Sequence, residues 1–299
     1  MKEKIIYALG YFDGVHLGHM ALLDACRKLA GETECKWGVV TFLGHPDTLV
    51  QGKTPGLINT DRDRKKLLCQ LHTDTILELP FDKKLMAMPW QDFLSMLVKD
   101  HHAAGFVCGT DFRFGKNGEG NARLLEEFCL QQKLVCCAVE QQCLDGIRIS
   151  STHIRNLLEQ GNMEEANRFL GHPHFLSGTV VTGKQLGRTI GAPTANLLYP
   201  AELAALPYGV YACQVETNGH VYWSVTNIGI RPTVAGEGIT VENWLQDFSG
   251  DLYGVELKIS FIKHIRPECK FPNLSELQKQ IQKDKKIVEN IVQNHKLHP

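Results

Sequence analysis

Short apolar runs alternate with amphipathic stretches throughout the first half of the chain. Runs rich in β-branched and aromatic residues are typical of buried strands. Such strands are predicted at residues 5–9, 37–42, 75–79, 105–108 and 135–139. The stretches between them carry apolar residues at helical spacing. Helices are therefore expected at residues 20–30, 61–71, 89–99 and 121–132. The β-α-β-α order predicts an α/β fold, a Rossmann-like parallel sheet with helices on both faces, whose ligands bind at the carboxyl ends of the strands.

The pattern changes after about residue 171, where glycines become frequent and helical spacing disappears. Short strands are predicted at residues 177–182, 210–216, 221–227, 240–245 and 255–262. They predict a second, all-β domain, a small antiparallel β-barrel, with Asn218-Gly219 as a hairpin turn. A final amphipathic stretch from residue 273 predicts a terminal helix that packs on the barrel. The predicted domains are residues 1–172 and 173–299.

Composition and charge narrow the class of protein. The 299 residues include 43% hydrophobic residues, enough to fill two cores. Because 32 Lys and Arg nearly cancel 33 Asp and Glu, no broad positive field is present and no nucleic-acid partner is expected. The first apolar run stops at Gly10, too early for a signal peptide, and no later run is long enough to span a membrane. We therefore expect a cytoplasmic protein without a membrane partner, and its oligomeric state stays open.

Ten cysteines are scattered through apolar runs without any CxxC pair. This distribution is typical of reduced cysteines in the cores of intracellular domains.

A turn with two glycines and two histidines follows the first predicted strand and opens the first helix. Gly14 and Gly18 allow a ligand to approach the backbone, and the amides at a helix start favour a phosphate. His16 and His19, three residues apart, can donate to the same phosphate and stabilise charge that builds on it. On its own, such a pair also fits surface residues or half of a metal site.

A second polar motif, I-S-S-T-H-I-R, follows the last strand of this half at residues 149–155. Its hydroxyls can cap the next helix, and Arg155, one turn further on, carries a guanidinium suited to phosphate oxygens. An ordinary helix cap with a solvated arginine is the alternative. The two motifs together favour a phosphate site that both of them form.

A glycine-rich segment at residues 183–197 opens the second domain. Thr194 and Asn196 lie two residues apart on an extended segment, so that both side chains face the same way and can serve a hydrated Mg²⁺ and its phosphates. The glycines free backbone amides to cradle those phosphates. A barrel loop with incidental polar residues is the alternative.

These motifs resemble the nucleotidylyltransferase superfamily and, most closely, the bacterial bifunctional riboflavin kinase and FAD synthetase (FMN adenylyltransferase) family. The resemblance covers nearly the whole chain and is carried by four segments. These are G-Y-F-D-G-V-H at residues 10–16, G-T-D-F-R-F-G at 109–115, G-R-T-I-G-A-P-T-A-N at 187–196 and T-V-E at 240–242.

The resemblance implies a role for each matching residue. The residues implied to bind ATP phosphates are Gly10, Phe12, Gly14, His16, His19, Ser151, Thr152 and Arg155 in the first domain and Gly183, Lys184, Gly187, Arg188, Gly191 and Pro193 in the second. The residues implied to contact flavin are Asp111, Phe112, Phe114, Asn121 and Glu242. The implied metal ligands are Thr194 and Asn196, and the implied catalytic residues are Glu242, His16 and His19.

Two reactions follow from the resemblance, with ATP as co-substrate and Mg²⁺ as cofactor. In the second domain, Glu242 would accept the proton of riboflavin's terminal hydroxyl as that oxygen attacks the γ-phosphorus of ATP, giving FMN. In the first domain, the phosphate of FMN would attack the α-phosphorus of ATP, giving FAD and pyrophosphate, through positioning and charge stabilisation without a side-chain nucleophile.

Two segments depart from the family pattern. Leu43-Gly44 replaces Asp-Pro before a His-Pro pair, and Asn243-Trp244 follows the predicted catalytic glutamate in place of the usual residues. A chain with only one active domain, transfer to another phosphorylated acceptor, and a flavin-binding regulator without turnover are the alternative functions.

Overall fold

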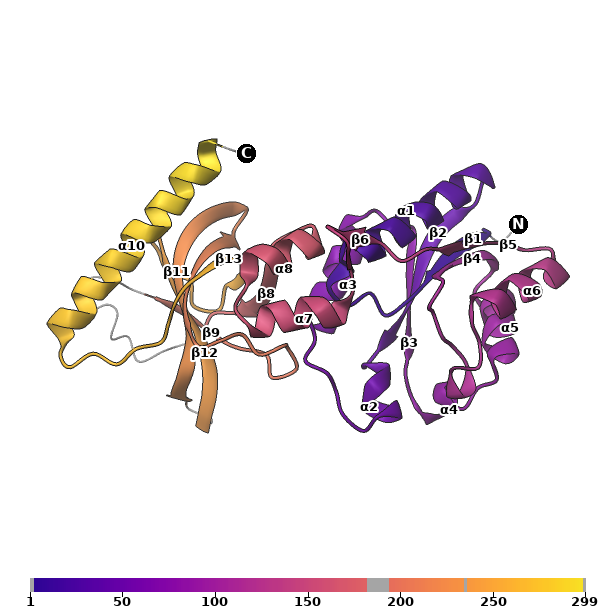
Figure 1. Cartoon of the computed structure of the whole chain (residues 1–299), viewed down its shortest axis with the longest axis horizontal. Helices are drawn as coiled ribbons and strands as arrows, with labels where there is room; N and C mark the ends of the chain where they lie inside the picture. The colour runs from indigo at the N-terminus through magenta and orange to yellow at the C-terminus, as the bar shows by residue number, and fades with distance from the viewer. Residues whose placement is uncertain (1–2, 182–193, 234–235, 298–299) are drawn as a thin grey trace. The chain divides into compact units, whose positions relative to one another are not determined.

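The computed structural model describes residues 3–181, 194–233 and 236–297. The chain divides into two compact units, residues 1–153 and 154–299 (Figure 1). The predicted strand at 177–182 ends at a residue outside the described ranges. The predicted boundary at 172/173 stays a prediction.

The first unit contains a five-stranded parallel sheet in the order β3-β2-β1-β4-β5. Its strands are β1 (Ile5–Leu9), β2 (Lys36–Leu43), β3 (Thr75–Pro80), β4 (Ala103–Gly109) and β5 (Val135–Val139). The predicted α/β fold and all five predicted strands are confirmed. Strand β1 is central, so the turn that follows it emerges in the middle of the carboxyl edge, where ligands of such sheets bind.

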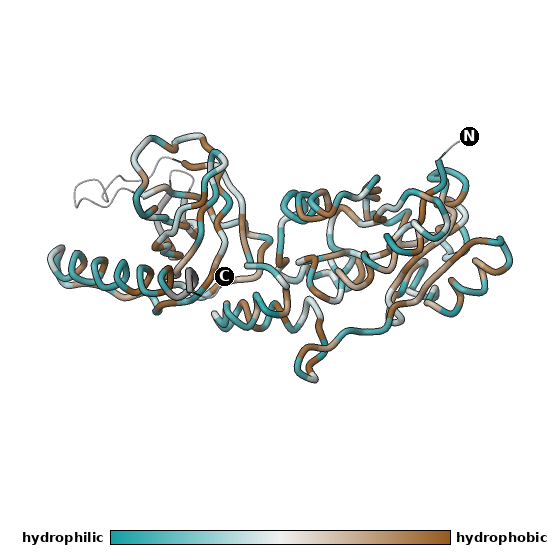
Figure 2. The backbone as a smooth tube through the Cα atoms, turned by 90° about the horizontal axis from the view of Figure 1, so that it is seen from above, coloured by the Kyte–Doolittle hydropathy of each residue, from teal (hydrophilic) through white to brown (hydrophobic). Residues whose placement is uncertain are grey.

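Helices cover both faces of this sheet. The larger ones are α1 (Leu17–Glu32), α3 (Asp61–Gln70), α5 (Trp90–Asp100) and α6 (Ala122–Gln132). Side chains of α1 and α3 pack on one face and those of α5 and α6 on the other. Smaller elements are η1 (Asp13–Val15), α2 (Pro46–Val50), α4 (Lys83–Met86), η2 (Lys116–Gly118), β6 (Cys143–Leu144) and β7 (Ile147–Arg148). Strands β1, β2, β4 and β5 carry mostly apolar residues, as burial between two helical layers requires, and Figure 2 shows hydrophobic (brown) segments alternating with hydrophilic (teal) ones along the backbone.

The second unit is built on a six-stranded antiparallel sheet in the order β8-β13-β10-β11-β12-β9. Its strands are β8 (His174–Thr179), β9 (Ala195–Leu198), β10 (Gly209–Thr217), β11 (His220–Thr233), β12 (Gly236–Leu245) and β13 (Glu256–Pro267). An antiparallel bridge between Val181 and Asn196 joins the segment after β8 to β9, the two ends of this order. The sheet therefore curls toward closure, in agreement with the predicted barrel.

The predicted hairpin turn is confirmed between β10 and β11. Thr217 pairs with His220, and Asn218 and Gly219 have φ of 49° and 76°. Two left-handed residues in a two-residue loop match the twist of the strands that they connect.

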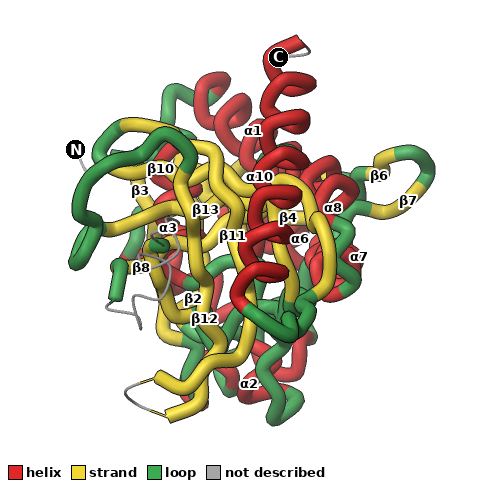
Figure 3. Tube along the Cα trace, turned by 90° about the vertical axis from the view of Figure 1, so that its left-hand side faces the viewer, coloured by secondary structure: helices red, strands yellow, loops and turns green. Residues whose placement is uncertain are grey.

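Helices flank the antiparallel sheet. Helix α7 (Ser151–Glu159) spans the boundary between the units, and α8 (Met163–Leu170) packs on β8 and β13. The predicted terminal helix is α10 (Leu274–Leu297), which lies along β10 and β11 (Figure 3). Asn273 caps it by accepting from the amide of Glu276 at 3.0 Å. The buried Asp284 of α10 accepts hydrogen bonds from the guanidinium of Arg266 on β13 at 2.8–3.2 Å, which ties the helix to the sheet.

All ten cysteines are free, and Cys26, Cys108, Cys129 and Cys213 are buried. Cys69, Cys143 and Cys269 are exposed, so the expected core position is wrong for these three. None of the helices in the described residues has the length and apolar character that a membrane crossing requires.

Candidate active sites

The turn between β1 and α1 has an unusual backbone. Phe12, Gly14 and Val15 have left-handed φ of 61°, 81° and 40°. The Phe12 ring is fully buried and fills the space beside Gly10, where a Cβ atom would lie 2.9 Å from the ring. Left-handed conformations of non-glycine residues are costly, so the surrounding contacts must hold this turn in shape.

His16 and His19 are stacked at the start of α1. Their ring centroids lie 3.6 Å apart with 12° between the planes. The Nδ1 atom of His16 accepts a hydrogen bond from the backbone amide of His19 at 3.2 Å, which caps the helix. In a neutral ring this leaves the proton on Nε2, where it can be donated to a ligand.

The imidazole of His19 is suited to act as a neutral donor. Burial, followed by the neighbouring His16 and the charge of Arg64, holds the pKa of His19 well below its usual range. A positive charge on the stacked ring of His16, 3.6 Å away, disfavours a second positive charge on His19.

The two motifs that the sequence pairs, 138 residues apart, meet in the first unit. The hydroxyl of Ser151 donates to the backbone carbonyl of Asp13 at 3.0 Å. The neighbouring Ser150 accepts from the amide of His153 at 3.2 Å and so caps α7, as predicted. The hydroxyl segment is therefore attached directly to the histidine turn.

The carboxylate of Asp13 anchors the same turn from another side. It is 2% exposed and accepts hydrogen bonds from the amide of Ile58 at 2.9 and 3.2 Å and from that of Asn59 at 3.3 Å. The sequence offered Asp13 only as part of a motif, and its role as a bridge to residues 58–59 needed the fold.

A cavity of about 240 Å³ lies against these motifs. It is lined by His16, Gly18, His19, Leu22, Gly109, Asp111, Val139, Glu140, Gln141, Gln142, Arg148, Ile149, Ser150 and Ser151. The structure thus brings predicted phosphate residues and the predicted flavin residue Asp111 to one cavity. Arg148, which forms an ion pair with Asp111, was missed, although it directly precedes the I-S-S-T segment.

The predicted flavin-side loop follows β4. Phe112 and Phe114 are stacked with their centroids 5.7 Å apart, and Phe114 is 6% exposed in the core. Asn121 caps α6 by accepting from the amide of Leu124 at 3.1 Å. Phe114 and Asn121 therefore shape the loop that presents Asp111 to the cavity.

Other phosphate residues predicted for the first domain are not among the residues that line this cavity. Gly10, Phe12 and Gly14 belong to the turn that leads to His16, and Thr152 is exposed. Arg155 lies one turn after Ser151 on α7, past the boundary between the units. Its contact with phosphate stays a prediction.

In the second unit, Glu242 and Asn196 are direct partners in the pairing of β12 with β9. Directly opposite residues have side chains on the same face, with Cβ atoms about 5 Å apart. Thr194 precedes Asn196 by two residues. The side-chain Nδ2 of Asn196 donates a hydrogen bond to the backbone carbonyl of Thr194 at 3.3 Å. The pairing therefore brings together the predicted base and one predicted metal ligand, although the sequence places them 46 positions apart.

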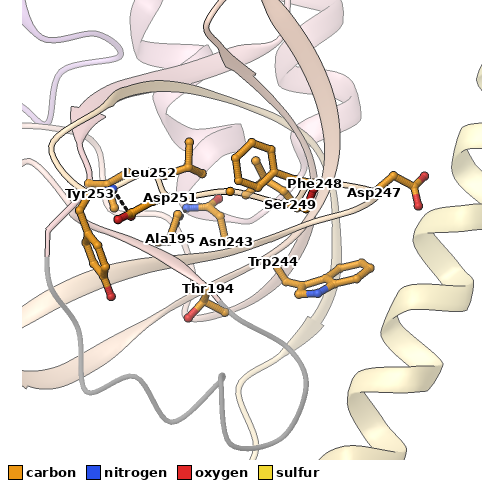
Figure 4. Close-up of a pocket in the computed structure, with 13 residues that line it drawn as sticks. Thr194, Ala195, Asn243, Trp244, Asp247, Phe248, Ser249, Asp251, Leu252 and Tyr253 are labelled. Carbon is orange, nitrogen blue, oxygen red and sulfur yellow. Dashed lines mark hydrogen bonds between the residues drawn. The ribbon is translucent and has the colours of Figure 1, made fainter.

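A cavity of about 370 Å³ adjoins Thr194 (Figure 4). Its lining consists of Val180, Thr194, Ala195, Asn243, Trp244, Leu245, Asp247, Phe248, Ser249, Gly250, Asp251, Leu252 and Tyr253. Glu242 and Asn196 are not among these residues, and along β12 and β9 their side chains alternate with those of Asn243 and Ala195, which line the cavity.

Two of the residues that depart from the family pattern, Asn243 and Trp244, have defined places. Asn243 is fully buried and accepts from the hydroxyl of Thr226 at 2.8 Å, while its amide donates to the carbonyl of Ala195 at 3.3 Å. The indole of Trp244 points toward α10, whose Lys285 ammonium lies 3.7 Å from the ring centroid (Figure 4). Asn243 thus joins β12 to β9 from inside the sheet.

The remaining predicted phosphate residues lie outside the described residues. These are Gly183, Lys184, Gly187, Arg188, Gly191 and Pro193. Within residues 3–181, 194–233 and 236–297, no group of three or more His, Cys, Asp or Glu is close enough to hold a metal ion. The oxygens of Thr194, Asn196 and Glu242 are the type of ligand that Mg²⁺ prefers.

Two family models match the chain. Residues 1–153 match the model described as FAD synthetase, and residues 170–292 match the model described as riboflavin kinase. The predicted pair of domains is thereby confirmed in its order along the chain.

Curated relatives match both halves together. The bifunctional riboflavin kinase/FMN adenylyltransferase of Bacillus subtilis (strain 168) is 38% identical over 289 residues, which are 95% of this chain and 91% of the relative. The protein of the same name from Escherichia coli (strain K12) is 36% identical with the same coverage. A crystal structure titled as a macrolide-efflux protein from Streptococcus pneumoniae matches with a TM-score of 0.87 at 29% identity, covering 97% of this chain and 95% of that chain, and supports the same fold. The chain belongs to the family of bifunctional riboflavin kinase/FMN adenylyltransferases.

Proposed function

We propose a residue-level assignment for the two reactions of this family. Residues of the first unit adenylylate FMN to FAD, and residues of the second unit phosphorylate riboflavin to FMN. The observation that supports the first assignment most strongly is the junction of two distant motifs, in which Ser151 is bonded to the turn that carries His16 and His19. A protein that only binds flavin has no need for paired phosphate donors.

In adenylyl transfer, the stacked histidines hold the phosphates of ATP. The Nε2–H of His16 and the amides at the start of α1 donate to phosphate oxygens, and Ser151 supports the turn. An oxygen of the FMN phosphate forms a bond to the α-phosphorus of ATP while the bond to the bridging oxygen breaks. Pyrophosphate leaves with the electron pair, and fixed neutral donors stabilise the charge that builds on it.

The flavin side of this site is the loop after β4. Asp111 and Arg148 face the cavity as an ion pair, and Phe112 offers an aromatic surface beside them. Phe114 and Asn121 keep this loop in position from the core and from the cap of α6.

In riboflavin phosphorylation, Glu242 accepts the proton of the terminal hydroxyl as that oxygen attacks the γ-phosphorus of ATP. Thr194 and Asn196 would hold Mg²⁺, which offsets the negative charge of the phosphates when it is bound. The direct pairing of Glu242 with Asn196 supports this assignment. The segment 183–193 is expected to cradle the ATP phosphates.

The substrates are therefore riboflavin, FMN and ATP. The expectations of a cytoplasmic location and of no nucleic-acid or membrane partner stay predictions.

Single substitutions test the two assignments in the full chain, with flavins separated by chromatography. His16→Ala should abolish FAD formation and leave FMN formation from riboflavin unchanged. Glu242→Gln should abolish FMN formation and leave FAD formation from supplied FMN unchanged. The exposed His72→Asn and Glu216→Gln variants are matched controls that should keep both activities.

The same reactions separate the alternative functions. If the wild-type chain makes only FMN, the first unit is catalytically inactive or transfers the adenylyl group to another acceptor. If FAD forms when FMN is supplied but not when riboflavin is supplied, the second unit is catalytically inactive. Unchanged flavin in both reactions would favour a binding protein.

A further inference from the structure

A buried arginine lies beneath the histidine turn of the first unit. Arg64 on α3 is 1% exposed, and its guanidinium carbon lies 4.1 Å from the centroid of the Tyr11 ring. Its Nη2 atom donates to the carbonyl of Phe42 at the end of β2 at 2.6 Å and lies 3.0 Å from the carboxylate of Asp61. Arg64 thus joins the ends of β1 and β2 at the edge of the sheet that carries the candidate site.

The guanidinium is incompletely satisfied. Its Nη1 atom is buried, and in the described part of the chain nothing accepts a hydrogen bond from it. The ion-pair partner Asp61 is 39% exposed, so its charge is partly screened by water. A buried charge held in this way is expensive for folding, and an apolar side chain of similar volume is often tolerated at least as well.

A short path of contacts leads from Arg64 to the histidines. The guanidinium lies over the ring of Tyr11. The backbone carbonyl of Tyr11 accepts a hydrogen bond from the hydroxyl of Thr41 at 2.9 Å. The next residue, Phe12, is left-handed, and its ring centroid lies 5.2 Å from that of His19. The conformation at Phe12 places both the ring and the start of α1, so the support under Tyr11 bears directly on His16 and His19.

We propose that Arg64 is a positioning residue for adenylyl transfer: it fixes the Tyr11–Phe12 segment so that His16 and His19 are held in line with the ATP phosphates. This inference rests on the proposed function of the histidine pair. Arg64 also helps to keep His19 neutral, because its charge lowers the pKa of that histidine.

The test uses the full chain with three substitutions, Arg64→Met, Arg64→Lys and Arg62→Met. Arg62 is the exposed neighbour on the same helix and serves as the matched control. The rate of FAD formation is measured at varied ATP and FMN, with FMN formation as an internal standard. Hydrogen exchange of the β1 and β2 amides reports the stability of the first unit.

Arg64→Met should lower kcat for FAD formation by about tenfold to a hundredfold, because misplacement by about 1 Å has effects of that size. KM for ATP should change less than kcat, and exchange protection should stay the same or rise. Arg64→Lys keeps the charge but not the planar group that lies on Tyr11, so its kcat should fall between those of the wild type and Arg64→Met. Arg62→Met should behave as the wild type.

Two results would overturn the proposal. One is an unchanged kcat in Arg64→Met, and the other is a loss of exchange protection in both Arg64 variants, which would make Arg64 purely structural. His16→Ala is measured in parallel. If that variant retains FAD formation, the proposed function itself fails; if it is inactive while Arg64→Met is fully active, only the role of Arg64 fails.

Discussion

Asp13→Ala is expected to disable FAD formation through the shape of the turn that carries His16. The substitution leaves the buried amides of Ile58 and Asn59 without their acceptor. Each unsatisfied buried donor costs about 1–3 kcal/mol, so the first unit should lose roughly 2–6 kcal/mol of its free energy of unfolding. Because small domains have only about 5–15 kcal/mol of stability, this loss is large. FAD formation should fall steeply, since the left-handed turn loses an anchor.

The assay follows FMN and FAD in one reaction that starts from riboflavin. FMN should accumulate at the wild-type rate in the Asp13→Ala variant, because the second unit is unchanged. Asp24→Ala is the control: Asp24 is an exposed acid on α1 whose ion pair with Arg27 at 2.8 Å contributes little to stability. Wild-type FAD formation by Asp13→Ala, with unaltered hydrogen exchange at β1, would refute the reasoning.

Three further predictions concern stability. Burial lowers the pKa of His174 to about 3. The unfolded chain binds this proton at a higher pH than the folded chain does, so the free energy of unfolding is full above about pH 6.5 and decreases as the pH falls. The decrease is about 2 kcal/mol between about pH 7.5 and about pH 5. In His174→Phe, hydrogen exchange of the β13 amides should lose most of this pH dependence, and an unchanged pH profile would contradict the prediction. Asp284→Ala leaves the guanidinium of Arg266 without its carboxylate partner and should cost the second unit about 3 kcal/mol in exchange protection. Wild-type protection in this variant would show that the ion pair does not hold α10 on the sheet. Gly115 has φ of +73°, and a Cβ atom added there would lie 2.6 Å from Trp90 Cα. Gly115→Ala should therefore reduce the free energy of unfolding of the first unit by roughly 3 kcal/mol and lower its melting temperature. An unchanged melting curve would contradict this prediction.

Strong periodic patterns made most of the fold predictable. The predicted strands at residues 5–9 and 135–139 coincide with β1 and β5, because short apolar runs flanked by polar residues have only one way to be buried in a parallel sheet. Helix α1 begins at Leu17, before the predicted residue 20, because the His16 side chain caps it. A histidine cap is outside the usual set of capping residues.

Short elements carried too little pattern to be predicted. Strands β6 and β7 have two residues each, and β9 has four beside a glycine-rich segment, so neither alternation nor length was available. Helix α8 was also missed, although it has a clear apolar face.

Candidate site residues were predictable where a motif lies in one stretch of sequence. His16, His19 and Ser151 were found in this way and line one cavity. Arg64 and Arg148 were missed because single arginines in polar surroundings resemble solvated residues. Only the fold shows that Arg64 is buried and that Arg148 pairs with Asp111.

The central claim is that the two reactions occur at independent sites, one in each unit. It is tested most directly by mixing the His16→Ala and Glu242→Gln variants with riboflavin, ATP and Mg²⁺ and measuring FAD over time. The account predicts that neither variant alone makes FAD from riboflavin and that the mixture does, because FMN released by His16→Ala is adenylylated by Glu242→Gln. FAD from either variant alone would contradict the assignment of that residue, and a mixture that makes FMN but no FAD would contradict independent sites.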